Sequence, residues 1–466
     1  MSAADLLSII SVESGSPIHD PATGDLIAHA PVGDIKTLDS AIAAARKAQP
    51  AWAALSDDKR RELLNAAADA VEKHAEELAV LLSREQGKPL NGPNARFEVG
   101  GCVGWLRTTA ALPLEPEVIV DDGEKHAVME YRPIGVVGAI GPWNWPMMIA
   151  VWQFAPALRM GNTVVMKPSE NTPLSVLALA HVINTVLPED VFRIVTGDGE
   201  VGAALSAHPD IDKIMFTGST PTGKAIMRSA AENLARLTLE LGGNDAGIVL
   251  PDADPEKIAE GLFWGAFINT GQTCAALKRL YVHEDIYDAV VEELVAVAEK
   301  MPMGIGLDEN NVLGPLQNRA QYDIVAGLVE AARESGARIV LGGDPDPGQA
   351  GNFYPTTIVA DIAPDNELVT TEQFGPALPV IRYSDVNEAV RMANDSPVGL
   401  GGSVWSSNPE AARAVARRIQ AGTVWINNHG AIDPRVPFGG IKESGYGIEF
   451  GVQGLKSLGV PQVIMS

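Results

Sequence analysis

The stretch GVVGAIGPWNWPMMIAVWQFAPALRMGNTVVMKPSE, residues 135–170, decides the fold. It opens with the β-branched run 135–140, continues through an apolar segment that can form a helix from about Pro146, and closes with a second β-branched run, 163–167. Short runs of this kind, separated by helices of about 10 to 15 residues, are typical of a parallel sheet built from βαβ units. The stretch therefore predicts an α/β fold.

The alternation continues on the C-terminal side of this stretch. A helix from Pro173 is followed by strands at 191–195 and 213–217 with helices from about Gly202 and Pro221. A second alternating region begins near Leu241 and predicts a second α/β domain. Its expected strands are 246–250, 280–283, 338–341, 379–383 and 423–427, and its helices include 286–300 and 321–334.

The N-terminal part of the chain has a different pattern. Turn residues between short apolar runs predict a hairpin within residues 15–31. Apolar residues at helical spacing predict one amphipathic helix over 57–83. The runs 118–121 and 128–132 flank a turn and have low apolar content, so we expect an arm of strands outside the main core.

Length and composition limit the class of protein. With 466 residues the chain is long for one core and predicts two or more domains. Its net charge of −24 disfavours nucleic acid and anionic membranes as partners. Two cysteines make no disulfide framework, and the N-terminus lacks the pattern of a secretory signal, so we expect a cytoplasmic protein. We expect no metal site.

The candidate nucleophile is Cys274, in the segment Gly271–Gln272–Thr273–Cys274. Small neighbours leave room for a substrate to approach the thiol. A single cysteine is more often a small buried apolar residue, so this assignment depends on the other segments.

Two Gly-rich segments can hold phosphate. Residues 197–202 satisfy the Gly-x-Gly-x-x-Gly pattern, but Asp198 and Glu200 would bring negative charge to a pyrophosphate, and an ordinary strand-to-helix turn is the alternative. Residues 217–224 offer small residues, hydroxyls and a proline suited to a helix start. They predict phosphate binding, with a simple capped helix as the alternative.

Polar residues follow other predicted strands. Lys167 and Glu170 lie at the carboxyl end of strand 163–167 and can bind ribose hydroxyls, or form an exposed ion pair. Glu170 would repel a 2′-phosphate and favours NAD over NADP. Asn144 can donate to an oxyanion, unless it only forms a turn. Glu240 lies after an apolar strand and can act as a general base, unless it is structural.

Together these segments resemble the NAD(P)-dependent aldehyde dehydrogenase superfamily from about residue 15 to residue 455. The matching motifs are 141–146, 166–170, 216–223, 239–244, 271–274, 372–376 and 437–440. The resemblance implies a Rossmann-type NAD-binding domain (1–113 and 134–242), an α/β catalytic domain (243–442), and a small β oligomerisation arm with the C-terminal tail (114–133 and 443–466). It also implies homodimers or homotetramers.

The resemblance also implies roles for single residues. Cys274 becomes the nucleophile, Glu240 the general base, and Asn144 the oxyanion donor together with the Cys274 backbone N–H. Glu372 would hold the nicotinamide ribose and Phe374 would pack near the nicotinamide, although Gln373 stands where an apolar residue is more usual. The implied cofactor-binding residues are Trp143, Lys167, Ser169, Glu170, Gly202, Gly218, Ser219, Leu241, Glu372 and Phe374.

The implied reaction is oxidation of an aldehyde by NAD, with NADP less favoured. Cys274 attacks the aldehyde to give a thiohemiacetal, hydride leaves, and the resulting thioester is hydrolysed to the carboxylic acid. Glu240 favours hydrolysis over transfer to coenzyme A. The alternatives are a coenzyme A-acylating dehydrogenase and a catalytically idle NAD-binding member.

The substrate tunnel implied by family position is rich in tryptophan. It predicts an apolar aromatic or medium-chain aliphatic aldehyde, although each aromatic could instead be core packing. Arg435 offers an alternative, a semialdehyde dehydrogenase that binds a substrate carboxylate, unless Arg435 pairs with Asp433. His429 is a substrate contact or a surface residue of its loop. The implied tunnel residues are Trp105, Trp145, Met148, Ile149, Trp152, Thr273, Ala275, His429 and Phe438.

Overall fold

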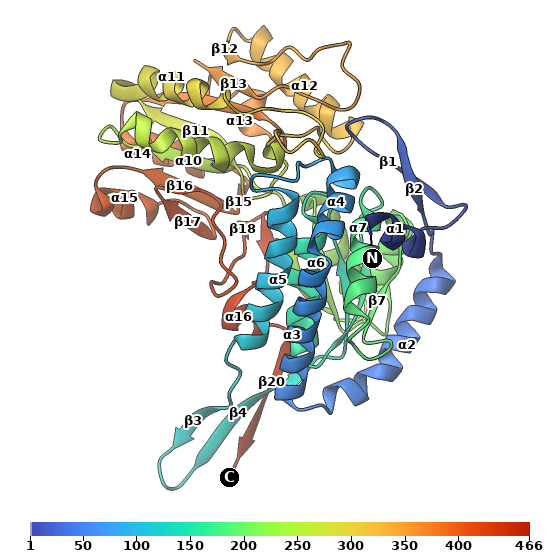
Figure 1. Cartoon of the computed structure of the whole chain (residues 1–466). Helices are drawn as coiled ribbons and strands as arrows, with labels where there is room; N and C mark the ends of the chain where they lie inside the picture. The colour runs from blue at the N-terminus through green and yellow to red at the C-terminus, as the bar shows by residue number, and fades with distance from the viewer. Residues whose placement is uncertain (1) are drawn as a thin grey trace.

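The computed structural model describes residues 2–466 and confirms the predicted α/β class (Figure 1). Within these residues, the quoted stretch supplies the centre of a six-stranded sheet in the order β19-β9-β8-β5-β6-β7, parallel except at β19. Every residue of β5, β6 and β8 is buried, as expected of strands covered by helices on both faces. The strands are β5 (Val136–Ile140), β6 (Thr163–Lys167), β7 (Phe192–Ile194), β8 (Lys213–Thr217), β9 (Arg236–Glu240) and β19 (Gly445–Tyr446).

Helices cover both faces of this sheet because successive strand residues point in opposite directions. Val137 and Val164 pack into one apolar core with the helices α1 (Ala3–Ile10), α3 (Asp57–Lys73), α4 (Ala75–Gln86), α5 (Ala95–Ala111), α6 (Pro146–Arg159) and α7 (Pro173–Ile183). Val136 and Val165 pack into a second core with α2 (Ile35–Ala53), α8 (Gly199–Ala207) and α9 (Thr220–Ala230).

The single helix predicted over 57–83 is wrong. The chain leaves helical geometry at His74, where ψ is 20°, and α3 and α4 are separate helices. The break lets both helices pack against α7, with Leu64 and Val71 buried on α3 and Leu78 and Leu82 buried on α4.

The second predicted α/β region forms its own sheet, seven-stranded within the described residues, in the order β12-β13-β14-β11-β10-β16-β17. All pairings are parallel except β12 with β13. The strands are β10 (Asp245–Val249), β11 (Leu277–His283), β12 (Arg338–Leu341), β13 (Thr357–Ala360), β14 (Ala377–Tyr383), β16 (Gly401–Trp405) and β17 (Thr423–Ile426). The helices are α10 (Pro255–Phe267), α11 (Tyr287–Ala298), α12 (Arg319–Glu334), α13 (Glu367–Thr370), α14 (Val386–Asn394) and α15 (Pro409–Ala416).

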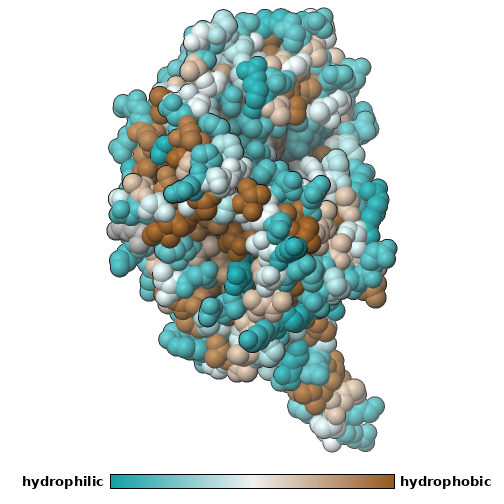
Figure 2. Space-filling view, turned by 90° about the vertical axis from the view of Figure 1, so that its right-hand side faces the viewer, coloured by the Kyte–Doolittle hydropathy of each residue, from teal (hydrophilic) through white to brown (hydrophobic). Residues whose placement is uncertain are grey.

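The predicted arm projects from the body of the protein (Figures 1 and 2). It consists of β3 (Glu117–Asp121), β4 (His126–Pro133) and β20 (Gly459–Met465), with β4 in the middle. The C-terminal strand pairs antiparallel with β4 from Gly459 opposite Pro133 to Met465 opposite Ala127. Val118, Ile119 and Met465 leave apolar surface exposed on this arm.

Smaller elements complete the chain. The predicted N-terminal hairpin is confirmed as β1 (Ser16–His19) paired with β2 (Leu26–Ala30). β15 (Val398–Gly399) pairs with β18 (Ile441–Lys442), and α16 (Gly451–Lys456) precedes the last strand. Among residues 2–466, each helix is too short or too polar to cross a membrane.

Asn162 ties the start of β5 to the root of the arm. This fully buried side chain accepts a hydrogen bond from the Gly135 N–H at 2.9 Å and donates one to the Leu458 carbonyl at 2.9 Å. Its loss would leave two buried backbone groups without partners.

We therefore expect Asn162→Ala to lower the free energy of unfolding by about 2 to 4 kcal/mol, measured by urea denaturation followed by tryptophan fluorescence. The matched control is Asn310→Ala, because Asn310 is exposed and bonds only within its own turn. Equal, small effects of the two substitutions would contradict this account of Asn162.

Candidate active site

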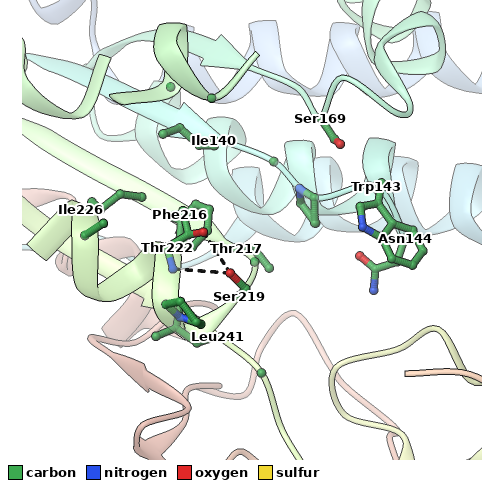
Figure 3. A pocket seen from close by; sticks show the side chains of 18 of the residues that line it. Ile140, Trp143, Asn144, Ser169, Phe216, Thr217, Ser219, Thr222, Ile226 and Leu241 are labelled. Atoms are coloured by element: carbon green, nitrogen blue, oxygen red, sulfur yellow. Dashed lines mark hydrogen bonds between the residues drawn. The ribbon is translucent and has the colours of Figure 1, made fainter. Parts of the chain in front are cut away.

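A cleft of about 890 Å³ opens where β5, β6 and β8 end. Ligands of open α/β sheets bind at this carboxyl edge. In Figure 3, Trp143 and Asn144, from the loop after β5, lie across the cleft from the Ser219–Thr222 turn. All ten expected cofactor residues line this cleft, namely Trp143, Lys167, Ser169, Glu170, Gly202, Gly218, Ser219, Leu241, Glu372 and Phe374.

The first turn of α9 has the geometry of an anion site. Ser219 is the N-cap and its hydroxyl accepts the Thr222 N–H at 3.4 Å. A Cβ at Gly218 would come within 2.5 Å of the Phe216 ring, so any other residue here would require that ring to shift. The helix N-terminus presents N–H groups and a positive dipole end, which is chemistry that can bind phosphate.

The Gly-rich segment 197–202 divides between two cavities. Gly199 and Gly202 line the main cleft, whereas Asp198 and Glu200 line a neighbouring cavity of about 260 Å³. Asp198 also caps α8 by accepting the Glu200 N–H. Gly199 and Gly202 thus lie at the main cleft, while Gly197 and the two carboxylates line the smaller cavity.

Lys167 and Glu170, the two residues expected to bind ribose hydroxyls, lie at the end of β6. The buried Lys167 ammonium donates to the Pro168 carbonyl at 3.0 Å and lies 3.4 Å from a carboxylate oxygen of Glu170. The two residues thus form an ion pair, but Lys167 is buried and not exposed as the alternative required, and both residues line the cleft.

Cys274 follows a backbone with unusual geometry. Asn269, Thr270 and Gly271 have φ values of 50°, 55° and 76°, a left-handed conformation that costs energy in non-glycine residues. A Cβ at Gly271 would lie 2.2 Å from the Gly375 carbonyl oxygen, so this turn packs directly on the 372–376 motif.

Asn144 is held beside the nucleophile segment. Its side-chain amide donates to the Gln272 carbonyl at 2.9 Å, and its own carbonyl accepts from Asn269 Nδ2 at 2.9 Å. An amide nitrogen carries two N–H groups, so Asn144 can still donate to a second acceptor.

The Cys274 thiol is half-buried and lines the cleft. Burial raises its pKa to about 12, and Glu240, Glu372 and Asp245 add to the increase, while Lys278 opposes it. The thiol is therefore protonated near neutral pH and needs a base or a cation to become a nucleophile.

Glu240 ends β9 and is buried. Within residues 2–466 neither carboxylate oxygen has a hydrogen-bond partner. Burial, and then the charge of Glu449, hold the pKa of Glu240 well above its usual range. A buried carboxyl with free oxygens can exchange a proton with water that enters the site.

Glu449 is a site residue that the sequence patterns did not identify. Burial raises its pKa to about 7, with Lys213 acting in the opposite direction. Paired backbone hydrogen bonds between Glu449 and Phe438, at 2.8 and 2.9 Å, hold it against the 437–440 motif. Its remote position in the chain gave no sequence signal for a second carboxyl beside Glu240.

A cluster of aromatic rings lies in the apolar core against which Cys274 packs. Trp105 and Trp152 have ring centroids 5.4 Å apart, and Phe450 lies 5.6 Å and 4.8 Å from them. Phe438 stacks on Phe450 at 5.8 Å. Phe450 was not predicted. The same apolar core contains the expected residues Trp145, Met148, Ile149 and Ala275, and Cys274 packs against it.

Thr273 joins this cluster through a hydrogen bond, since its hydroxyl accepts the Trp145 indole N–H at 2.9 Å. The surface alternative for His429 is wrong. Its ring is buried, lies 2.9 Å from the Ser403 hydroxyl and 3.6 Å from Asp245, and stacks near Trp425.

Arg435 is exposed and already has an anionic partner. Its guanidinium makes a bidentate contact with Asp433, at 2.8 Å and 2.5 Å. This pairing, which also holds the pKa of Asp433 at about 2, confirms the loop-anchor alternative.

Glu372 and Phe374 lie at the Cys274 end of the cleft. Glu372 Oε1 accepts the Gly243 N–H at 3.2 Å and lies 2.8 Å from Lys278 Nζ. Phe374 meets Trp143 edge to face, with ring centroids 5.3 Å apart. The unusual Gln373 is buried and donates to the Lys278 and Ala377 carbonyls.

Known proteins match the chain along almost its whole length. A sequence model described as "Aldehyde dehydrogenase family" matches residues 10–463. The phenylacetaldehyde dehydrogenase of Pseudomonas fluorescens is 39% identical over 94% of this chain and 90% of that protein. The mitochondrial benzaldehyde dehydrogenase of Antirrhinum majus is 39% identical over 95% of this chain and 84% of that protein.

Solved structures agree with this match. The NAD+ complex of an aldehyde dehydrogenase from Bacillus cereus superposes with a TM-score of 0.93 at 36% identity. The superposition covers 97% of this chain and 92% of the Bacillus cereus chain.

The raised pKa of the Cys274 thiol predicts how it reacts. Because the thiolate is the nucleophile, we expect iodoacetamide to modify Cys274 about tenfold faster for each pH unit between about pH 7 and 9, measured by mass spectrometry. Cys102 serves as the internal control, because burial raises its pKa and hides it from the reagent. A rate independent of pH would mean that the thiolate already exists.

Proposed function

The chain belongs to the aldehyde dehydrogenase family, and from this premise we propose that it oxidises an apolar aldehyde to a carboxylic acid with NAD. The aldehyde is aromatic or a medium-chain alkanal. One observation carries the proposal: Cys274 lines the large cleft and also packs against the apolar core that contains the aromatic cluster. A thiol at that junction can meet a cofactor from one side and an apolar substrate from the other.

The first chemical step belongs to Cys274. Its sulfur attacks the carbonyl carbon of the aldehyde, and the thiol proton passes to a base, for which Glu240 is the neighbouring carboxyl. The oxygen of the resulting thiohemiacetal accepts the second N–H of the Asn144 amide and the Cys274 backbone N–H. The first Asn144 N–H is bound to Gln272, which fixes the direction of the second.

The second half of the reaction is oxidation and hydrolysis. The nicotinamide ring supplies the acceptor for the hydride that leaves the thiohemiacetal carbon. Once Glu240 has released the thiol proton to solvent, its charged form takes a proton from water, and the hydroxide attacks the thioester. The tetrahedral adduct expels the Cys274 thiolate and leaves the carboxylic acid, and Glu240 returns its proton to the thiolate.

The cleft fits a dinucleotide in the chemistry of its walls. The α9 N-terminus suits the pyrophosphate, Lys167 and Glu170 suit one ribose, and Glu372 suits the other. Asp34, Asp198 and Glu200 line the cavity beside Glu170. Their negative charge would repel a 2′-phosphate, which supports NAD over NADP.

The aromatic cluster supports an apolar substrate. Trp105, Trp152 and Phe450 offer ring faces and edges that bind aromatic or alkyl groups by dispersion. The named relatives act on phenylacetaldehyde and benzaldehyde. The alternative, a semialdehyde bound by Arg435, would require that residue to leave Asp433. We further propose that the arm joins subunits into a homodimer or homotetramer in the cytoplasm.

The substrate class is tested by the initial rate of NADH formation with benzaldehyde, phenylacetaldehyde, octanal and succinic semialdehyde. We expect the apolar aldehydes to have at least about tenfold higher kcat/KM than the semialdehyde, because a carboxylate loses hydration in an apolar pocket. Cys274→Ala should form no NADH. A preference for succinic semialdehyde that disappears in Arg435→Ala would support the alternative.

Product analysis separates hydrolysis from acyl transfer. With Glu240→Gln we expect kcat to fall about 100-fold to 10,000-fold, because the general base is lost. An acyl-coenzyme A product, with a rate indifferent to this substitution, would contradict the hydrolytic mechanism. NAD binding without turnover of any aldehyde would favour an idle member.

The electrostatics of Glu240 predict a pH dependence. Only its charged form accepts a proton, and its pKa is raised, so single-turnover acyl hydrolysis should speed up as pH rises through that pKa. Glu449→Gln removes a charge that raises this pKa, so the rising limb should move to lower pH. Glu256→Gln, an exposed position, is the matched control. An unmoved limb in Glu449→Gln would contradict the coupling.

A further inference from the structure

Lys278 is a buried cation that contacts the Cys274 main chain and Glu372 and lies outside the matching motifs. It lies on β11, four residues after Cys274, and its side chain is almost fully buried. The ammonium donates to the Cys274 carbonyl at 2.5 Å and lies 2.8 Å from Glu372 Oε1. It also lies 5.6 Å from the centre of the Phe374 ring.

The contacts of Glu372 leave one of its oxygens for a ligand. Oε1 is occupied by Lys278 and by the Gly243 N–H. Oε2 lies against the backbone of Gly242, so closely that a Cβ at that residue would be 2.4 Å from it. Within residues 2–466, Oε2 has no hydrogen bond. A carboxylate fixed through one oxygen can present the other to a diol with little loss of side-chain entropy.

We propose that Lys278 is a positioning residue that joins cofactor binding to the nucleophile: it fixes Glu372 for a ribose diol and keeps its positive charge beside Cys274. The identity of the ribose as that of the nicotinamide rests on the proposed function. The charge beside the thiol does not, because it follows from the contacts of Lys278 alone.

The charges around Cys274 show why a cation matters there. Carboxylates face the thiol from β9 (Glu240), from β10 (Asp245) and from the loop after α13 (Glu372), and each raises its pKa. Lys278, from β11, acts in the opposite direction. Beyond these, Glu449 stands beside Glu240, and His429 lies 3.6 Å from Asp245.

The polar residue at position 373 fits the same arrangement. Gln373 Nε2 donates to the Lys278 carbonyl at 3.2 Å and to the Ala377 carbonyl at 2.6 Å. Lys278 is therefore tied to the 372–376 segment at its main chain as well as at its side chain. An apolar residue at position 373 could not make the main-chain link.

A merely structural ion pair makes a different prediction from the proposed role. If Lys278 and Glu372 only stabilised the fold, removing either partner would disturb the site in the same way. If charge is what matters, the two substitutions have opposite effects on the thiolate. Lys278→Met removes a cation and disfavours it, whereas Glu372→Gln removes an anion and favours it.

The experiment measures iodoacetamide modification of Cys274 against pH in the full-length protein, without aldehyde. We expect Lys278→Met to slow modification about tenfold at a given pH, Glu372→Gln to speed it, and Lys278→Arg to stay near the unsubstituted protein. Lys257→Met is the matched control, because Lys257 is exposed and pairs only with Asp254. Circular dichroism confirms that each variant is folded.

Calorimetric titration with NAD measures the affinity for the cofactor, and so tests whether Lys278 fixes Glu372 for the ribose diol. We expect both Lys278→Met and Glu372→Gln to weaken NAD binding about tenfold or more, while Lys278→Arg restores most of it. Shifts of the modification profile in the same direction for the Met and Gln variants, or no shift for Lys278→Met, would overturn the proposal. If Lys278→Met fails to fold, Glu372→Gln and Lys278→Arg still test the proposal. Slower modification of Cys274 in Glu372→Gln would overturn it.

The two proposals fail separately. Absence of NAD binding by the unsubstituted protein would contradict the proposed function, yet the opposite shifts in thiol reactivity would still support the role of the Lys278 charge.

Discussion

The main-chain carbonyl of Asn144 is the point on which the site depends. It accepts hydrogen bonds from Lys88 at 2.7 Å and from Asn269 at 2.9 Å, and so joins the loop after β5 to the segment that carries Cys274. Lys88 is itself paired with the buried Glu98, whose carboxylate accepts the Met147 and Met148 N–H groups at the start of α6. These charges stay buried because each one has partners.

Buried charge is also what gives the site its chemistry. Cys274, Glu240 and Glu449 all have raised pKa values because water is excluded around them. Burial thus favours the neutral form of the Cys274 thiol and of the Glu240 carboxyl. Lys278 is the cation that offsets this burial at the thiol, and the same lysine contacts Glu372, which lines the main cleft. At Cys274, burial and the nearby carboxylates raise the thiol pKa, and the charge of Lys278 lowers it.

Backbone strain accompanies this arrangement. Asn269, Thr270 and Phe374 are non-glycine residues with positive φ, and they lie on the two segments that meet at Gly271 and Gly375. Such conformations persist only where surrounding contacts fix them. Here the Asn269 side chain bonds to Asn144 and Gln272, and Phe374 packs on Trp143. The strained residues thus lie where the wall of the main cleft meets the segment that carries Cys274.

The sequence by itself determined the α/β class, most strands of the two sheets and the local sites, although β13 and β16 of the second sheet were not predicted. Periodicity and β-branching act within a few residues, so the strands around 135–140, 163–167 and 213–217 and the helix start at Ser219 could be read directly. Only the tertiary structure decided which distant charges meet. Lys278 with Glu372, Glu449 with Glu240, and Phe450 with Trp152 are contacts between segments far apart in the chain. The break at His74 and the burial of His429 likewise follow from packing against neighbours that local patterns do not specify.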